Sequence, residues 1–422
     1  MKEKKSLGKI IVALNMSILF ILIASLSVLA ACNWFKRSQG SNGSGSSNDG
    51  GASSQPPVVW NGETDLSWYT ENPEAQEYSL NSAEQLAGLA CLVNGSAIMP
   101  ASEEETNPIT FEGKTITLEK DIDLGLKDEQ GTPISFEPIG NKTTFSGTFD
   151  GNGHTINNLY QSGWDFGYEW GKYGSIGLFG EVEDATIKNV IINGYEAQIE
   201  GGDIGGITGS ATGTCVFENI QIKNSKFGTY NNGIGGIIGW SGEGNYTFKN
   251  IHIAEDVIFG GLWGSFDSSV GGIVGQAEPL PSTYSFENVY IACRLDVFND
   301  CTASYDYYNY RMCGMIMGRL AQTTTIENSN YPDLSKYDIT CNNVTVVYGD
   351  WANYSYCRAD GERAKRVEDG FSYTGIAEDF DHSRCNLHCK EVIAFDQIFG
   401  GAQYAVKGIK SFEGVNVIYN NK

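Results

Sequence analysis

Hydrophobic and polar residues alternate in a phrase that recurs through the middle of the chain. The clearest copy, from Ile234 to Ile253, reads IGGIIGWSGEGNYTFKNIHI, and a close relative begins 30 residues earlier at Ile204. The phrase returns as VGGIVG with YSFENVYI, and two weaker copies read IGLFG with ATIKNVII and CGMIMG with TTTIENSNY. Recurrence at steps of about 30 residues predicts a stacked repeat, in which each unit covers the apolar surface of the next.

The composition of the phrase favours strands over helices, because glycine pairs and β-branched residues are unfavourable in helix interiors. A step of this length is enough for three short strands and their corners. The apolar parity also changes at one position: Phe248 lies two residues before Asn250, whereas Ile251 lies one residue after it. Side chains along a strand alternate with a period of two, so this switch predicts a corner in a parallel β-solenoid.

Asparagine suits such a corner because it tolerates the left-handed backbone conformation. Identical asparagines about 4.8 Å apart in a stack can also hydrogen-bond to one another as a ladder. The ladder predicted from the repeat contains Asn158, Asn189, Asn219, Asn250, Asn288 and Asn328.

The glycine phrases also carry a family resemblance. GLFG at Gly177–Gly180, with GITG, GIIG and GIVG in later copies, resembles the GLUG motif of bacterial surface proteins. The segments Phe145–Tyr160 and Trp60–Gly95 resemble the entry coil and the N-terminal lead-in of the same proteins. The resemblance covers residues 59–346 and implies an all-β fold, a right-handed parallel β-helix. Such modules occur in adhesin-like proteins, in lipoproteins and beside the catalytic domain of IgA-specific metallopeptidases, so the resemblance implies an architecture and leaves the activity open.

Both ends of the predicted solenoid need a cap, since exposed edge strands invite pairing with other chains. Ser82 and Gln85 have the spacing of a capping box, apolar residues follow at helical spacing, and Asn94-Gly95 ends the run. We expect a short N-terminal capping helix here. Residues 347–422 lose the repeat and are expected to form the last coil and an irregular C-terminal cap.

The first 58 residues predict export. Four lysines precede an apolar run that ends in Leu29-Ala30-Ala31-Cys32, the order of charge and apolarity in a secretory signal. The run is long enough to remain as an uncleaved membrane anchor. The last four residues resemble the bacterial lipobox, which implies a signal peptide at residues 1–32 and a lipid on Cys32. Residues 33–58 are rich in glycine and serine and are expected to form a flexible tether. We therefore expect an exported protein held at the cell membrane or surface by its lipid.

The net charge of the chain bears on which partners it can bind. The chain has 28 Lys and Arg against 51 Asp and Glu, a net charge of −23. This balance argues against binding nucleic acid or anionic lipid through charge.

Patterns for catalysis and metal binding are weak. None of the four histidines stands in a His-Glu-x-x-His pattern, so the metallopeptidase chemistry of the relatives is not expected. His382, Cys385, His388 and Cys389 match no common zinc spacing, and we expect neither a metal nor another cofactor. Asp150 and His154 bring a carboxylate and an imidazole close together, but Asp-Gly-Asn-Gly is also turn chemistry.

The remaining cysteines allow two interpretations. Cys91 and Cys215 are expected to be buried apolar residues. Cys293, Cys301, Cys313, Cys341 and Cys357 are close enough in the repeat to allow bridges whose pairing the sequence leaves open.

Insertions into the repeat are one-sided and aromatic. From each glycine phrase to the next asparagine there are 9 to 13 residues, whereas from asparagine to glycine phrase there are 20 to 30. One-sided insertions often build a binding face, and Tyr and Trp provide rigid contact area; alternatively, these rings pack on the solenoid wall.

We predict a surface-displayed, adhesin-like binding protein for a glycan or another surface component; the alternative is a carbohydrate-active β-helix enzyme. The predicted ligand-binding residues are Trp164, Trp170, Trp263, Tyr307, Tyr308 and Tyr310.

Overall fold

The chain divides into two units, Met1–Gln55 and Pro56–Lys422, and the computed structural model describes residues of the second. These are residues 57–95, 107–141, 143–163, 165–166, 174–199, 201–229, 232–261, 269–278, 280–298, 313–319, 337–349, 354–356 and 415–420. The predicted signal peptide, Cys32 and almost all of the predicted tether lie outside the described residues.

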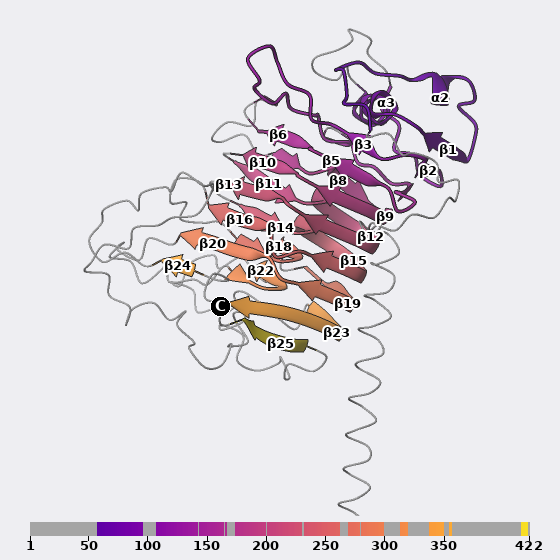
Figure 1. The fold of residues 1–422 in the computed structure, drawn as a ribbon. Helices are drawn as coiled ribbons and strands as arrows, with labels where there is room; N and C mark the ends of the chain where they lie inside the picture. The colour runs from indigo at the N-terminus through magenta and orange to yellow at the C-terminus, as the bar shows by residue number, and fades with distance from the viewer. Residues whose placement is uncertain are drawn as a thin grey trace, which may run out of the picture. The chain divides into compact units, whose positions relative to one another are not determined.

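The second unit is built of parallel strands in three sheets (Figure 1). The largest has fourteen strands: β1 (Glu77–Leu80), β2 (Thr115–Leu118), β3 (Ile122–Asp123), β4 (Thr148–Asp150), β5 (Thr155–Asn157), β8 (Phe179–Glu183), β9 (Thr186–Asn193), β12 (Thr208–Lys223), β15 (Ile238–Ile253), β18 (Val274–Ala277), β19 (Ser282–Ile291), β22 (Met317–Arg319), β23 (Tyr337–Gly349) and β25 (Val415–Asn420). The second has six: β6 (Tyr160–Ser162), β10 (Glu196–Ile199), β13 (Lys226–Thr229), β16 (Ile258–Gly261), β20 (Arg294–Phe298) and β24 (Tyr354–Tyr356). The third has five: β7 (Gly174–Ile176), β11 (Gly202–Gly205), β14 (Gly233–Gly235), β17 (Ser269–Gly271) and β21 (Cys313–Gly314).

Each repeat contributes to all three sheets in turn. The sequence order β10, β11, β12 is followed by β13, β14, β15, and each strand pairs with its equivalent in the next repeat. The register aligns Phe217, Phe248 and Phe286 in one column. Their rings stack with centroids 5.4 and 4.9 Å apart and are almost fully buried. The predicted all-β class with parallel strands is confirmed.

The glycine phrase is explained by backbone packing. A Cβ at Gly205, Gly235 or Gly271 would lie only 1.8–1.9 Å from a carbonyl oxygen three residues later in the same phrase. A Cβ on the second glycine of each pair would lie 2.1–2.2 Å from a backbone atom, and one on the last glycine of each phrase 2.5–2.9 Å from a backbone atom. The chain therefore turns back on itself between the five-stranded and fourteen-stranded sheets without room for a side chain.

The asparagine column lies where the apolar parity switches. Asn189, Asn219, Asn250 and Asn288 have φ between 54° and 56°. Asn219 donates its Nδ2 to Asn189 Oδ1 at 2.8 Å, Asn250 donates to Asn219 at 2.7 Å, and Asn288 donates to Asn250 at 3.2 Å. The side chains therefore bond directly from one repeat to the next.

Two members of the predicted ladder need correction. Asn158 has φ 56° but occupies the following corner, where its Nδ2 donates to Asp123 Oδ1 at 2.9 Å. Asn328 lies outside the described residues, and the ladder position after Asn288 belongs to Asn343, which donates to Asn288 Oδ1 at 2.8 Å. At the other end, Asn189 donates to Asp150 Oδ1 at 2.9 Å.

The helix predicted after Ser82 is present as α3 (Ala83–Asn94), preceded by a single turn, α2 (Ser67–Thr70). Ser82 Oγ accepts the Gln85 N–H, and Gly95 ends α3 with φ 62°. The Asn94 side chain ties the end of α3 to the segment before β4, accepting from the backbone of Gly140 and Asn141 and donating to Pro138 O.

The predicted boundary at residue 346 falls within β23, which runs to Gly349. β23 pairs in parallel with both β19 and β25. Apart from β24, β25 and the end of β23, the predicted C-terminal cap lies outside the described residues.

Candidate functional site

The insertions of successive repeats begin and end at equivalent strands. Each connects a strand of the six-stranded sheet to a strand of the five-stranded sheet: β6 to β7, β10 to β11, β13 to β14, β16 to β17 and β20 to β21. The strands on each side are hydrogen-bonded in sequence order, so the attachment points form two neighbouring rows (Figure 1). We call this edge the insertion corner.

The predicted ligand-binding residues fall in the longer of these connections. Trp164 and Trp170 lie between β6 and β7, Trp263 between β16 and β17, and the three tyrosines between β20 and β21. All six lie outside the described residues, and their exposure stays a prediction. Phe166, in the first connection, is half-buried and packs against the core.

Asp150, the candidate catalytic carboxylate, is held by its neighbours. Its Oδ1 accepts from Asn189 Nδ2 and from the Asn152 backbone N–H at 2.8 Å, and its Oδ2 lies 3.3 Å from Lys188 Nζ. Partial burial alone would raise the pKa of this carboxyl, but the hydrogen bonds from Asn189 and Asn152 and the charge of Lys188 outweigh it, and the pKa is lowered. Asp150 is therefore an ionised acceptor at the base of the asparagine column.

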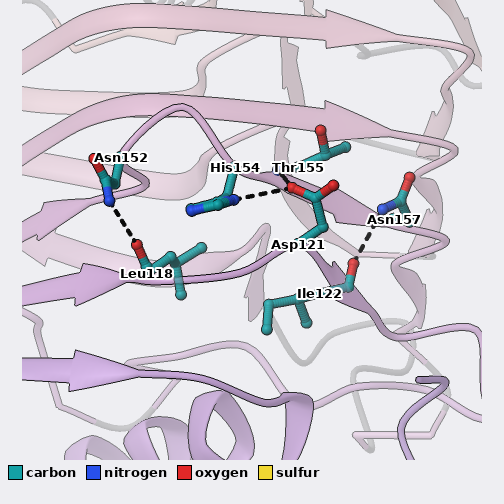
Figure 2. A network of polar contacts seen from close by, with 7 residues as sticks. All are labelled: Leu118, Asp121, Ile122, Asn152, His154, Thr155 and Asn157. Atoms are coloured by element: carbon teal, nitrogen blue, oxygen red, sulfur yellow. Dashed lines mark hydrogen bonds and ion pairs between the residues drawn. The ribbon is translucent and has the colours of Figure 1, made fainter. Parts of the chain in front are cut away.

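His154 is directed at a different carboxylate (Figure 2). Its Nδ1 lies 3.1 Å from Asp121 Oδ1, which also accepts the Thr155 N–H at 2.9 Å. Asn152 in this turn and Asn157 at the end of β5 donate their side-chain amides to the carbonyls of Leu118 and Ile122, each at 3.2 Å. These contacts tie the turn between β4 and β5 to the preceding segment, so Asp150 and His154 do not act on one point.

The outward face of the fourteen-stranded sheet carries two regular columns on β4, β9, β12, β15, β19 and β23. Strand register aligns the charged column Asp150, Lys188, Glu218, Lys249 and Glu287, followed by Asn342. Two residues earlier on each strand lies the hydroxyl column: Thr148, Thr186, Val216, Thr247, Ser285 and Thr340. All these residues are half-buried or exposed. We call this surface the sheet face.

Two further titratable groups have shifted pKa values. Burial lowers the pKa of His252 to about 4, against the opposing charge of Asp256; the ring stacks on Tyr290 with centroids 4.8 Å apart. Burial raises the pKa of Asp203 on β11 to about 7, and the Glu278 charge adds to the rise, while the hydrogen bond from Gly233 N at 2.8 Å opposes it.

The side chains of Cys215, Cys293 and Cys341 are thiols that form no disulfide. Cys91, Cys215 and Cys293 are buried thiols and Cys341 is half-buried; burial raises the pKa of Cys215 to about 11 and of Cys341 to about 12. The bridges that the sequence allows for Cys293 and Cys341 are therefore not formed. Cys301, Cys357 and the segment from His382 to Cys389 lie outside the described residues.

Within the described ranges, no group of three or more His, Cys, Asp or Glu side chains could hold a metal ion. None of the helices described has the length and apolarity that crossing a membrane requires.

Comparison with known proteins gives two partial similarities. No protein-family model matches the sequence. The chain is 34% identical over 143 residues to halomucin of Haloquadratum walsbyi, covering 32% of this chain and only 1% of halomucin. A crystal structure of a candidate immunoglobulin A1 protease from Bacteroides ovatus covers 71% of this chain and 81% of its own, with 15% identity and a TM-score of 0.33.

Proposed function

We propose that this protein is a cell-surface binding protein. In this proposal the repeats form a right-handed parallel β-helix, the lipid on Cys32 holds the chain at the membrane, and the insertion corner recognises a glycan or another surface component.

The observation that carries the proposal is the common origin of the insertions. Five consecutive connections start from adjacent strands of one sheet and end at adjacent strands of another. Strands in a sheet are about 4.8 Å apart, so the aromatic segments are attached side by side although Trp263 and Tyr307 are far apart in sequence. Repeat proteins commonly build their binding faces in this way, with a rigid stack supporting variable loops.

The state of Asp150 and His154 favours binding over the enzyme alternative. A general acid or base needs a pKa near the working pH and a free side toward the substrate. Asp150 has a lowered pKa and three neighbouring donors, and His154 is paired with Asp121. A turn held by these contacts has a structural role that needs no reaction.

A screen of the full chain in detergent against glycans and extracellular matrix proteins tests the proposal. We expect saturable binding to a restricted group of ligands, with no change in the length of any polysaccharide after prolonged incubation. Release of shorter sugar chains, lost in Asp150→Asn and retained in Trp263→Ala, would establish the enzyme alternative instead.

A further inference from the structure

The charged column on the sheet face alternates in sign at every step. From β4 to β19 it reads Asp150, Lys188, Glu218, Lys249 and Glu287. Two close pairs form within the chain, Lys188 with Asp150 at 3.3 Å and Lys249 with Glu218 at 3.8 Å. Glu287 follows both pairs, and the next strand presents Asn342, an amide, at this position.

The alternating charges stabilise the sheet within one chain, because opposite charges on neighbouring strands avoid repulsion and support the register. That benefit is small at a surface, where an ion pair contributes about 0–1 kcal/mol. Lys188, Glu218 and Lys249 all keep about a third or more of their side chains exposed. They therefore remain accessible to a second set of charges.

The hydroxyl column beside the charged column carries only small side chains. The hydroxyl column has Thr, Ser or Val in every strand from β4 to β23, and the strand register across both columns is unbroken. Six strands about 4.8 Å apart span roughly 24 Å across the stack, and the two columns lie about 7 Å apart along the strands. The side chains of this column are therefore too short to keep a second copy of the sheet face away.

The alternating column is complementary to itself. Consider a twofold axis that lies in the interface, parallel to the strands and midway between β12 and β15. It places Lys188 opposite Glu287 of the second copy, and Glu218 opposite Lys249 of the second copy. Asp150 then faces the amide Asn342 of the second copy, so every charge meets an opposite charge or an amide. A twofold axis perpendicular to the strands, along the direction in which they stack, would instead place each charge opposite the same charge of the second copy.

We propose that the sheet face is a homotypic interface, through which two copies of this chain associate about this twofold axis. Isologous interfaces of this kind are the commonest in homo-oligomers. The patch formed by these two columns is smaller than the roughly 800 Å² per copy of a standard interface, so the association is weak. Because charge pairs hold it, salt weakens it.

A carbodiimide, which joins a lysine amine directly to a carboxylate, tests this arrangement in the full chain. Lys188 and Glu287 are three strands apart, about 14 Å within one chain, beyond the combined reach of their side chains. We expect a cross-linked dimer at low salt that contains the Lys188–Glu287 link, and at least a fivefold lower yield at 1 M NaCl.

Charge variants separate this interface from other contacts. Lys188→Glu should abolish the dimer, and the double exchange Lys188→Glu with Glu287→Lys should restore it, because the pair between copies is re-formed with opposite polarity. Lys223→Glu, on β12 beyond the corner, is the matched control and should cross-link as the unmodified chain does. Circular dichroism melting checks that each variant is folded. A chain that stays monomeric at low salt, or an equal dimer yield from Lys188→Glu and Lys223→Glu, overturns the proposal.

Discussion

At the scale of single residues, the asparagine column combines two requirements that few side chains meet together. Each asparagine adopts positive φ, and each donates its Nδ2 to the Oδ1 of the preceding repeat. All the bonds run in one direction, and the last acceptor is the carboxylate of Asp150. Asp150 therefore ends the column with a charge-assisted hydrogen bond, which is stronger than a neutral one.

Replacing Asn250 with leucine should lower the free energy of unfolding by about 1–3 kcal/mol, through left-handed strain and unpaired amide groups on Asn219 and Asn288. Asn250→Gly is the matched control, since glycine accepts the φ of 54° but also removes the side-chain bonds. The difference between the two variants in urea unfolding isolates the strain. Equal stability of wild type and both variants would contradict the role of the column.

Asp203 should make stability depend on pH. Its carboxyl has a pKa raised to about 7 in the folded state against about 3.9 when unfolded. The unfolded chain therefore loses its proton first as pH rises, and the contribution of Asp203 to stability falls between about pH 4 and pH 7. Asp203→Asn keeps an acceptor for Gly233 N–H and should raise the melting temperature at pH 8 but not at pH 4. An equal shift at both pH values would refute this pKa.

Much of the column was predictable from residues alone. The pattern Phe-x-Asn-(Ile or Val)-x-Ile carries the parity switch in its clearest form, and it located Asn219, Asn250 and Asn288. Asn343 was missed because Cys341 replaces the phenylalanine in CNNVTV, although Cys341 aligns with Phe286. Asn158 was assigned to the wrong corner because Asp-Gly-Asn-Gly makes a longer turn between β4 and β5 than Asn189 makes within β9.

At the scale of elements, glycine packing determines how one strand leads to the next. The reversal between β14 and β15 brings the backbone into contact with itself, so that a Cβ at Gly235 would lie 1.9 Å from Ile238 O. The sequence showed that glycines recur at fixed positions of the repeat. The second glycine of each pair also lacks room for a side chain, because the backbone of the next repeat lies against it. One copy of the phrase, read alone, does not show this contact between repeats.

Gly235→Ala should lower the free energy of unfolding by more than about 3 kcal/mol, because the contact is with backbone and cannot relax through a rotamer change. Gly153→Ala is the matched control. Gly153 has φ 80°, and no atom lies near the position of its missing Cβ. The free energy of unfolding lost in Gly153→Ala should therefore come from backbone strain alone, about 1–2 kcal/mol. Urea unfolding of both variants measures this difference. An equal loss of unfolding free energy in the two variants would mean that the backbone contact at Gly235 does not destabilise the protein.

At the scale of the whole molecule, the same stack supports two surfaces with different chemistry. The insertion corner carries Trp and Tyr on connections that vary in length, whereas the sheet face carries a regular pattern of charge and hydroxyl groups. The sequence predicted that insertions leave from one side, because the distance from asparagine to glycine phrase is longer and varies more than the distance from glycine phrase to asparagine. It did not indicate the sheet face, since alternation of charge appears only when strand register aligns residues about 30 positions apart.

The most direct test of the binding function measures ligand binding by a chain that lacks the aromatic insertion residues. Trp263, Tyr307, Tyr308 and Tyr310 are replaced together by alanine, and Lys223→Ala on β12, outside both surfaces, serves as the control. Both proteins are compared with the unmodified chain on the same panel of glycans and matrix proteins. We predict at least tenfold weaker binding by the fourfold variant, with an unchanged melting temperature and full binding by the control. Full binding by the fourfold variant would contradict the assignment of the insertion corner as the recognition surface.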